Sequence, residues 1–75
     1  MQEAEIRLLF ECGSLKSATI TRAPLEDGWC LQFAKKVGGY EHLDSQRVSP
    51  RTFKTLDAAF QAVNRIGFQE ANVVV

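Results

Sequence analysis

The chain has 75 residues, of which 45% are hydrophobic and 24% charged, so it can build one core and is too apolar to be disordered. Nine Lys and Arg residues balance nine Asp and Glu residues, which gives a formal net charge of zero. This balance lacks the basic excess of a dedicated nucleic-acid-binding protein, and it does little to oppose self-association. We therefore expect a single domain over residues 1–75, with homodimerisation left open.

The first predicted element is a short helix over residues 3–12. Acidic side chains lie in its first turn, and Gly13 follows as a candidate C-cap. Apolar residues recur at helical spacing, at Ile6, Leu9 and Phe10. A strand is the alternative, because the same segment also fits a partial alternation of apolar and polar side chains.

Three strands are predicted next. Residues 16–22 are rich in β-branched side chains, and an Asp-Gly turn at 27–28 leads into the alternating strand 29–34. A second turn at 35–39 leads to a more polar strand over residues 40–46. One register gathers the large side chains on a single face, which predicts a core of Ile20, Trp29, Leu31, Phe33 and Leu43.

The last predicted elements are a helix and a terminal strand. Thr55 can cap a helix that Gly67 ends, and residues 71–75 form a valine-rich strand. The helix repeats apolar residues at Leu56, Ala59, Phe60, Val63 and Ile66. The fold class is α+β in the order α-β-β-β-α-β: a three-stranded antiparallel meander plus a C-terminal strand, packed against one main helix, with a short N-terminal helix.

Residue patterns that carry catalytic or metal chemistry are absent from the sequence. His42 is the only histidine, and no serine or cysteine lies in a nucleophile-elbow motif. The glycine pair at 38–39 lacks the context of a phosphate-binding loop. Trp29 could stack on a ligand, but its place in an alternating strand favours the core. We expect no enzyme activity, catalytic residue, metal, cofactor or small-molecule substrate.

The two cysteines, Cys12 and Cys30, lie in apolar-periodic segments and suggest neither a disulfide framework nor a zinc site. We expect both to be reduced. The first five residues are acidic rather than basic, and no apolar run approaches the roughly 18 residues of a membrane span. These features predict a cytoplasmic protein that does not contact a membrane.

Basic residues concentrate in the middle of the sequence, although the whole chain is neutral. If the meander turns Thr19, Thr21 and Gln32 outward, its basic turns could contact phosphates, while a merely solvated sheet face is the alternative. The candidate residues for contact with DNA or a protein partner are Arg22, Lys35, Lys36, Arg47, Arg51 and Lys54.

Two segments carry a family resemblance: Gly-Trp-Cys-Leu at residues 28–31, and Arg-Thr-Phe-Lys-Thr-Leu-Asp-Ala-Ala at residues 51–59. Together with the helix-ending glycine and the valine-rich end, they resemble small ParC-like partition-associated proteins of bacterial plasmids and integrated elements. The resemblance covers nearly the whole chain. It implies a non-enzymatic accessory role in the maintenance of a plasmid or mobile element. The zero net charge, the absence of a reactive cluster and a terminal strand at 72–75 with an edge open for pairing favour action through protein–protein contacts, either with a partner or by self-association.

The Arg-Thr-Phe-Lys-Thr segment at 51–55 also resembles the arm-binding N-terminal domain of tyrosine-type phage integrases, over residues 28–66. That resemblance implies a three-stranded sheet inserted into a DNA major groove. The acidic residues Glu41 and Asp44 of the third predicted strand depart from such a role. DNA binding by the sheet is therefore the alternative function that the sequence suggests.

Overall fold

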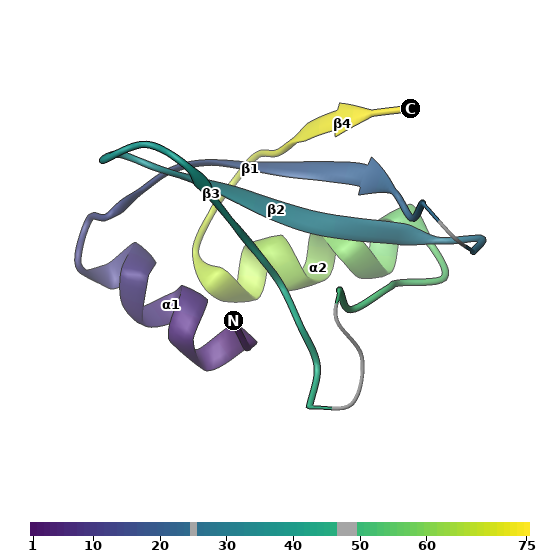
Figure 1. Ribbon diagram of the computed structural model, residues 1–75, viewed down its shortest axis with the longest axis horizontal. Coiled ribbons are helices and arrows are strands. Elements are labelled where there is room, and N and C mark those ends of the chain that lie inside the picture. Colours follow the sequence, from purple (N-terminus) through teal and green to yellow (C-terminus); the bar gives the residue numbers. More distant parts are fainter. Residues whose placement is uncertain (25, 47–49) are drawn as a thin grey trace.

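The computed structural model describes residues 1–24, 26–46 and 50–75. The helices and strands, in chain order, are α1 (Glu3–Glu11), β1 (Leu15–Arg22), β2 (Trp29–Lys35), β3 (Tyr40–His42), α2 (Leu56–Ile66) and β4 (Asn72–Val74). The strands form one mixed sheet in the order β3-β2-β1-β4, and both helices lie against the same face (Figure 1). The predicted α+β class and element order are confirmed.

The first segment is a helix, so the alternative prediction of a strand is wrong. α1 is capped by Cys12 and stops at Gly13, whose φ of 74° suits glycine. The backbone N–H of Ser14 donates to the Leu9 carbonyl at 2.9 Å. Ile6 is fully buried, and it fixes which side of α1 faces the sheet.

The meander has the predicted core face. β1 and β2 pair antiparallel, with Ile20 opposite Leu31 and Ala18 opposite Phe33. Of the predicted core residues, Trp29 is partly buried and packs against the core, and the other four are fully buried. Four further core residues, Ile6, Ala59, Val63 and Ile66, belong to the apolar patterns predicted for the two helices, and the core also holds Leu15, Ala18, Phe53 and Ala62.

The third strand is shorter than predicted, because β3 ends at His42 rather than at residue 46. Leu43 still donates its N–H to the Leu31 carbonyl, but the N–H of Asp44 donates to the Met1 carbonyl at 2.7 Å. The edge of β2 is completed further along the chain by Phe53, which forms an antiparallel bridge with Trp29. Two separate segments thus replace the single long strand.

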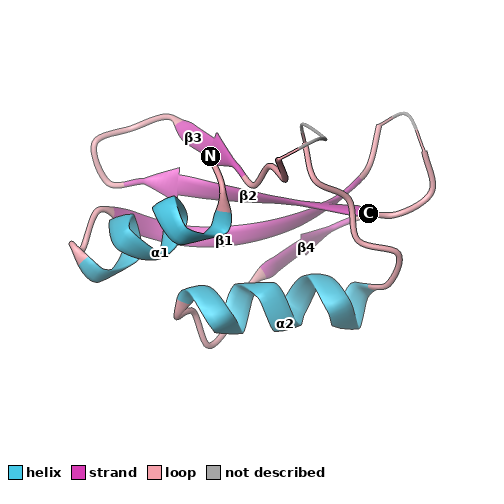
Figure 2. Ribbon diagram, turned by 90° about the horizontal axis from the view of Figure 1, so that it is seen from below, coloured by secondary structure: helices cyan, strands magenta, loops and turns pink. Residues whose placement is uncertain are grey.

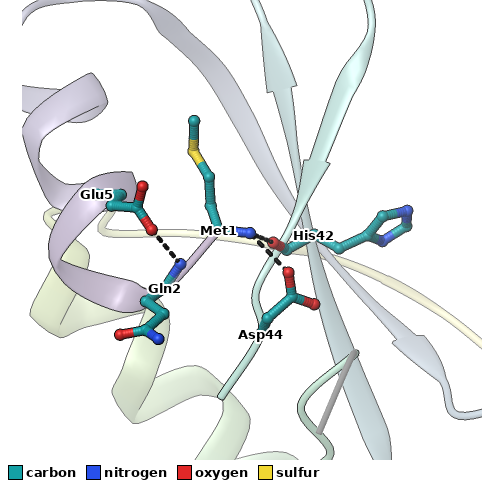
Figure 3. A network of polar contacts seen from close by, with 5 residues as sticks. All are labelled: Met1, Gln2, Glu5, His42 and Asp44. Carbon is teal, nitrogen blue, oxygen red and sulfur yellow. Dashed lines mark hydrogen bonds and ion pairs between the residues drawn. The ribbon is translucent and has the colours of Figure 1, made fainter. Parts of the chain in front are cut away.

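The beginning of the chain is held against the end of β3 (Figure 3). The amino group of Met1 lies 2.6 Å from the Asp44 carboxylate and donates to the His42 carbonyl at 3.3 Å. The Asp44 contact raises the pKa of this amino group. The imidazole of His42 points away from the network and is exposed, in agreement with a solvated histidine.

α2 begins and ends where the sequence predicts. The hydroxyl of Thr55 accepts a hydrogen bond from the Ala58 N–H at 3.1 Å, and Gly67 is the C-cap with a φ of 136°. Its buried residues are Ala59, Ala62, Val63 and Ile66. The two other apolar residues of the predicted pattern, Leu56 and Phe60, are instead 38% and 37% exposed.

Candidate functional site

The orientation of α2 explains why two of its apolar residues remain exposed. Arg65 donates twice to the carboxylate of Glu3 in α1, at 3.0 and 3.1 Å. At about 100° per residue, Leu56 and Phe60 lie on the flank of α2 opposite Arg65. That flank therefore faces away from α1 and toward the edge of the sheet formed by β4. Figure 2 shows α1 and α2 separated in this way, with β4 on the α2 side.

Exposed apolar side chains gather along this edge. Val73 is opposite Ile20 in the parallel β1–β4 register, so its side chain lies on the helix-covered face, yet it is 46% exposed. Val74 is 55% exposed and Val75 92%. We call the group the apolar edge, and it consists of Leu56, Phe60, Val73, Val74 and Val75. Clustered exposed apolar residues of this kind mark interaction surfaces more often than isolated ones do.

A cleft of about 200 Å³ lies where the chain enters β4. It forms because β4 pairs only with Thr19–Thr21, so among the described residues no strand covers the first half of β1 on that side. The cleft is lined by Lys16, Ser17, Ala18, Phe68, Glu70, Ala71 and Asn72. The apolar edge thus ends in a small open hollow that carries one cation and one carboxylate.

The basic residues singled out from the sequence do not form one group. The register places Arg22 opposite Trp29 at one end of the β1–β2 pair and Lys35 opposite Leu15 at the other end. Lys36 follows Lys35 in the turn, while Arg51 and Lys54 flank Phe53, which bridges to Trp29. Arg47 lies outside the described residues. The structure therefore separates Lys35 and Lys36 from Arg22, Arg51 and Lys54.

Three of these basic residues already have partners within the fold. The guanidinium of Arg22 lies 5.1 Å from the Trp29 ring centroid, and that of Arg51 lies 4.7 Å from the Phe53 centroid. Lys35 contacts Glu41 at 3.2 Å. Because Trp29 and Phe53 are bridged, the two arginine–aromatic pairs adjoin one another at the start of α2. Both arginines therefore make contacts within the fold.

Glu3 connects both helices to the loop that precedes α2. Besides its two hydrogen bonds from Arg65, its carboxylate lies 3.8 Å from Arg51. The hydrogen bonds from Arg65 lower the pKa of Glu3, desolvation by burial opposes the shift, and the charges of Arg65 and Arg51 add to it. This ion pair links α1 to the flank of α2 opposite Leu56 and Phe60.

Acidification is expected to remove the contribution of Glu3 to stability. Because its pKa is lower in the folded state, the contribution is complete above the unfolded-state value of about 4.5 and is lost as the pH falls through the folded-state value. Glu3→Gln should lower the free energy of unfolding by about 1 kcal/mol at neutral pH. In urea titrations the difference from wild type should shrink toward zero at acidic pH, and Arg65→Gln should behave alike. A difference that stays constant with pH would contradict this account.

The sheet face opposite the helices carries a central row of polar, uncharged side chains, with the exposed Val74 beside it at the β4 edge. The three pairings place His42, Gln32, Thr19 and Asn72 in one row across all four strands. Thr19, Thr21 and Gln32 point outward as the sequence predicted, and each is partly exposed. Cys30 lies on the same face but is only 5% exposed, and burial together with the charge of Glu26 raises the pKa of its thiol. This thiol is a poor nucleophile near neutral pH.

Metal ligands, cysteines and long apolar helices were the remaining features to locate in the described residues. Within them, no group of three or more His, Cys, Asp or Glu side chains is arranged to bind a metal ion. Both cysteines are free, Cys12 at the surface and Cys30 inside. No helix in the described part of the chain is long and apolar enough to cross a membrane.

Sequence reasoning pointed to the open edge of the terminal strand at 72–75 but missed the contribution of α2, because it placed Leu56 and Phe60 in the apolar pattern that packs the helix on the sheet. A signal was present: at about 100° per residue the apolar residues of α2, from Ala58 to Phe60, span about 200° of its circumference, wider than the roughly 100° stripe that one buried face requires. Comparison of the chain with protein families, curated proteins and solved structures finds no match. The function must therefore be argued from the site itself.

Proposed function

We propose that the protein is a non-enzymatic accessory protein of a plasmid or mobile element, which acts in the cytoplasm through protein–protein contacts at the apolar edge. The observation that carries the proposal is the concentration of exposed valines and α2 side chains beside an open strand edge. Strand edges with apolar neighbours bind extended segments through backbone hydrogen bonds and side-chain contacts. The resemblance to ParC-like proteins supplies the biological setting.

DNA binding by the sheet remains the alternative, with less support. The register places no Lys or Arg in the row formed by His42, Gln32, Thr19 and Asn72. With β4 added, three strand spacings of about 4.8 Å make the sheet wider than the roughly 12 Å major groove of DNA. Of the two basic residues at the ends of the β1–β2 pair, Lys35 is already paired with Glu41 at 3.2 Å.

The proposal predicts that a charge on the apolar edge impairs retention of the genetic element that encodes the protein. Val75 and Val37 offer a matched pair, since each is 92% exposed but Val37 lies in the β2–β3 turn. The measurement is the fraction of cells that keep the element over generations without selection. Val75→Lys should approach the loss rate of a deletion of the gene, and Val37→Lys should behave as wild type. Equal retention in all strains would rule the proposal out.

A further inference from the structure

The edge of β4 has a backbone arrangement that identifies one residue as its centre. The N–H of Ala23 donates to the Gly28 carbonyl, so Ala23 directs its backbone groups toward β2. Backbone groups alternate in direction along a strand, so Thr21 and Thr19 also direct theirs toward β2. Ile20, which lies between them, directs its N–H and C=O toward β4. In a parallel pair, the residue opposite such a position turns its own N–H and C=O away. That residue is Val73, so its backbone groups point to the open edge.

An antiparallel strand can bond to this edge, and β4 itself has the required properties. Val73 presents its backbone N–H and C=O to the open side. Around a two-fold axis, the Val73 residues of two copies can therefore exchange both hydrogen bonds, as opposite residues do in an antiparallel pair. Residues 71–75 carry no charged side chain, and the chain has no net charge to oppose association of identical copies. The edge is therefore complementary to itself in hydrogen bonding and in charge.

We propose that the partner at the apolar edge is a second copy of this chain, joined by antiparallel pairing of β4 with β4 around a two-fold axis at Val73. This inference rests on the proposed function and names the partner at the same site. The pairing merges the two sheets into one of eight strands. It places Val75 of the second copy opposite Ala71, beside the cleft that Ala71 lines together with Phe68.

The flank of α2 supplies contact area that the strand alone lacks. Stable interfaces bury about 800 Å² on each partner, more than the pairing of two short strands provides. If the alternation of β4 continues to residue 75, Val73 and Val75 of the second copy have side chains on the helix-covered face, the face on which α2 carries the exposed Leu56 and Phe60. Burial of Leu56, Phe60, Val73 and Val75 from both copies would give the interface an apolar core, as in other homodimer interfaces.

The test is the molar mass of the full chain in solution, measured by light scattering over a range of concentrations. The wild type should reach twice the chain mass of 8.4 kDa. Val73→Pro should be monomeric and folded, because proline removes an N–H that points to solvent in the single chain, where edge strands tolerate it. Val73→Lys should also be monomeric, since it places two cations at the axis, whereas Val37→Lys should remain dimeric. A circular dichroism spectrum unchanged from wild type confirms that each variant is folded.

Disulfide trapping tests the position of the axis. In a Cys12→Ser background, Val73→Cys should form a covalent dimer on oxidation, because paired residues at a two-fold axis lie about 5.5 Å apart between Cα atoms, within disulfide range. Val37→Cys should not. A wild type that is monomeric at every concentration would overturn the dimer, and the proposed function would still stand if Val75→Lys impaired retention. A dimer whose disruption leaves retention unchanged would instead uphold this inference and refute the proposed function.

Discussion

Replacing Gly67 with alanine is expected to lower the free energy of unfolding by about 2–5 kcal/mol. A Cβ atom at this position would lie 2.6 Å from Cδ1 and 2.9 Å from Cζ of Phe10. The Phe10 ring cannot easily retreat, because it packs edge-on against Phe68 with 4.8 Å between centroids. The φ of 136° adds strain for any residue with a side chain. A loss of this size would unfold much of a 75-residue domain.

Gly13→Ala is the matched control, measured in the same urea titrations. Gly13 also caps a helix at positive φ, but nothing lies within 4 Å of the Cβ position. Gly13→Ala should therefore lower the free energy of unfolding by only the conformational penalty of about 1–2 kcal/mol. The double variant Phe10→Ala/Gly67→Ala should be less unstable than the sum of its single changes, because one removes the collision that the other creates. Equal costs at Gly13 and Gly67 would show that the Phe10 contact has no energetic consequence.

Replacing Phe33 with alanine should cost about 3–5 kcal/mol. Phe33 is fully buried at the middle of β2 and stacks on Phe68 with 6.0 Å between ring centroids. Removal of its ring leaves a cavity where β1, β2 and the end of α2 meet, and the neighbouring strands cannot collapse to fill it. Thermal and urea unfolding followed by circular dichroism would measure the loss.

The same substitution at Phe60 separates stability from association. Phe60 is 37% exposed, so Phe60→Ala should lower the unfolding free energy of the single chain much less than Phe33→Ala does. It should nevertheless weaken the dimer, because it removes part of the apolar flank. If Phe60→Ala were as destabilising as Phe33→Ala at concentrations where the chain is monomeric, Phe60 would belong to the core. It would then not be part of the apolar edge.

The fold could be predicted where local chemistry determines structure. Gly13 and Gly67 end their helices because they adopt positive φ, and Thr55 caps α2 through its own hydroxyl. The alternation from Trp29 to Phe33 fixed the core face of the meander. Each of these signals acts between residues close in sequence, so the chain itself carries it.

The remaining features depend on contacts between distant segments. β3 stops early because Met1 takes the Asp44 N–H, and no local pattern announces that contact. Which part of the wide apolar arc of α2 is buried depends on how the helix packs in the core, through Val63 and Ile66 and beside Ile6 of α1. The candidate basic residues come from one stretch of sequence, but the β1–β2 register separates Arg22 from Lys35.

The parallel pairing of β4 with β1 has a consequence for how the chain folds. Thr19 pairs with Asn72, which lies near the other end of the chain, whereas β1, β2 and β3 are joined by short turns. Contacts between residues so far apart form slowly because closing the intervening loop costs entropy. During synthesis the meander can form first, and one edge of β1 then stays open until residues 72–74 are available to pair with it. That edge would be the segment most exposed to mispairing in a newly made chain.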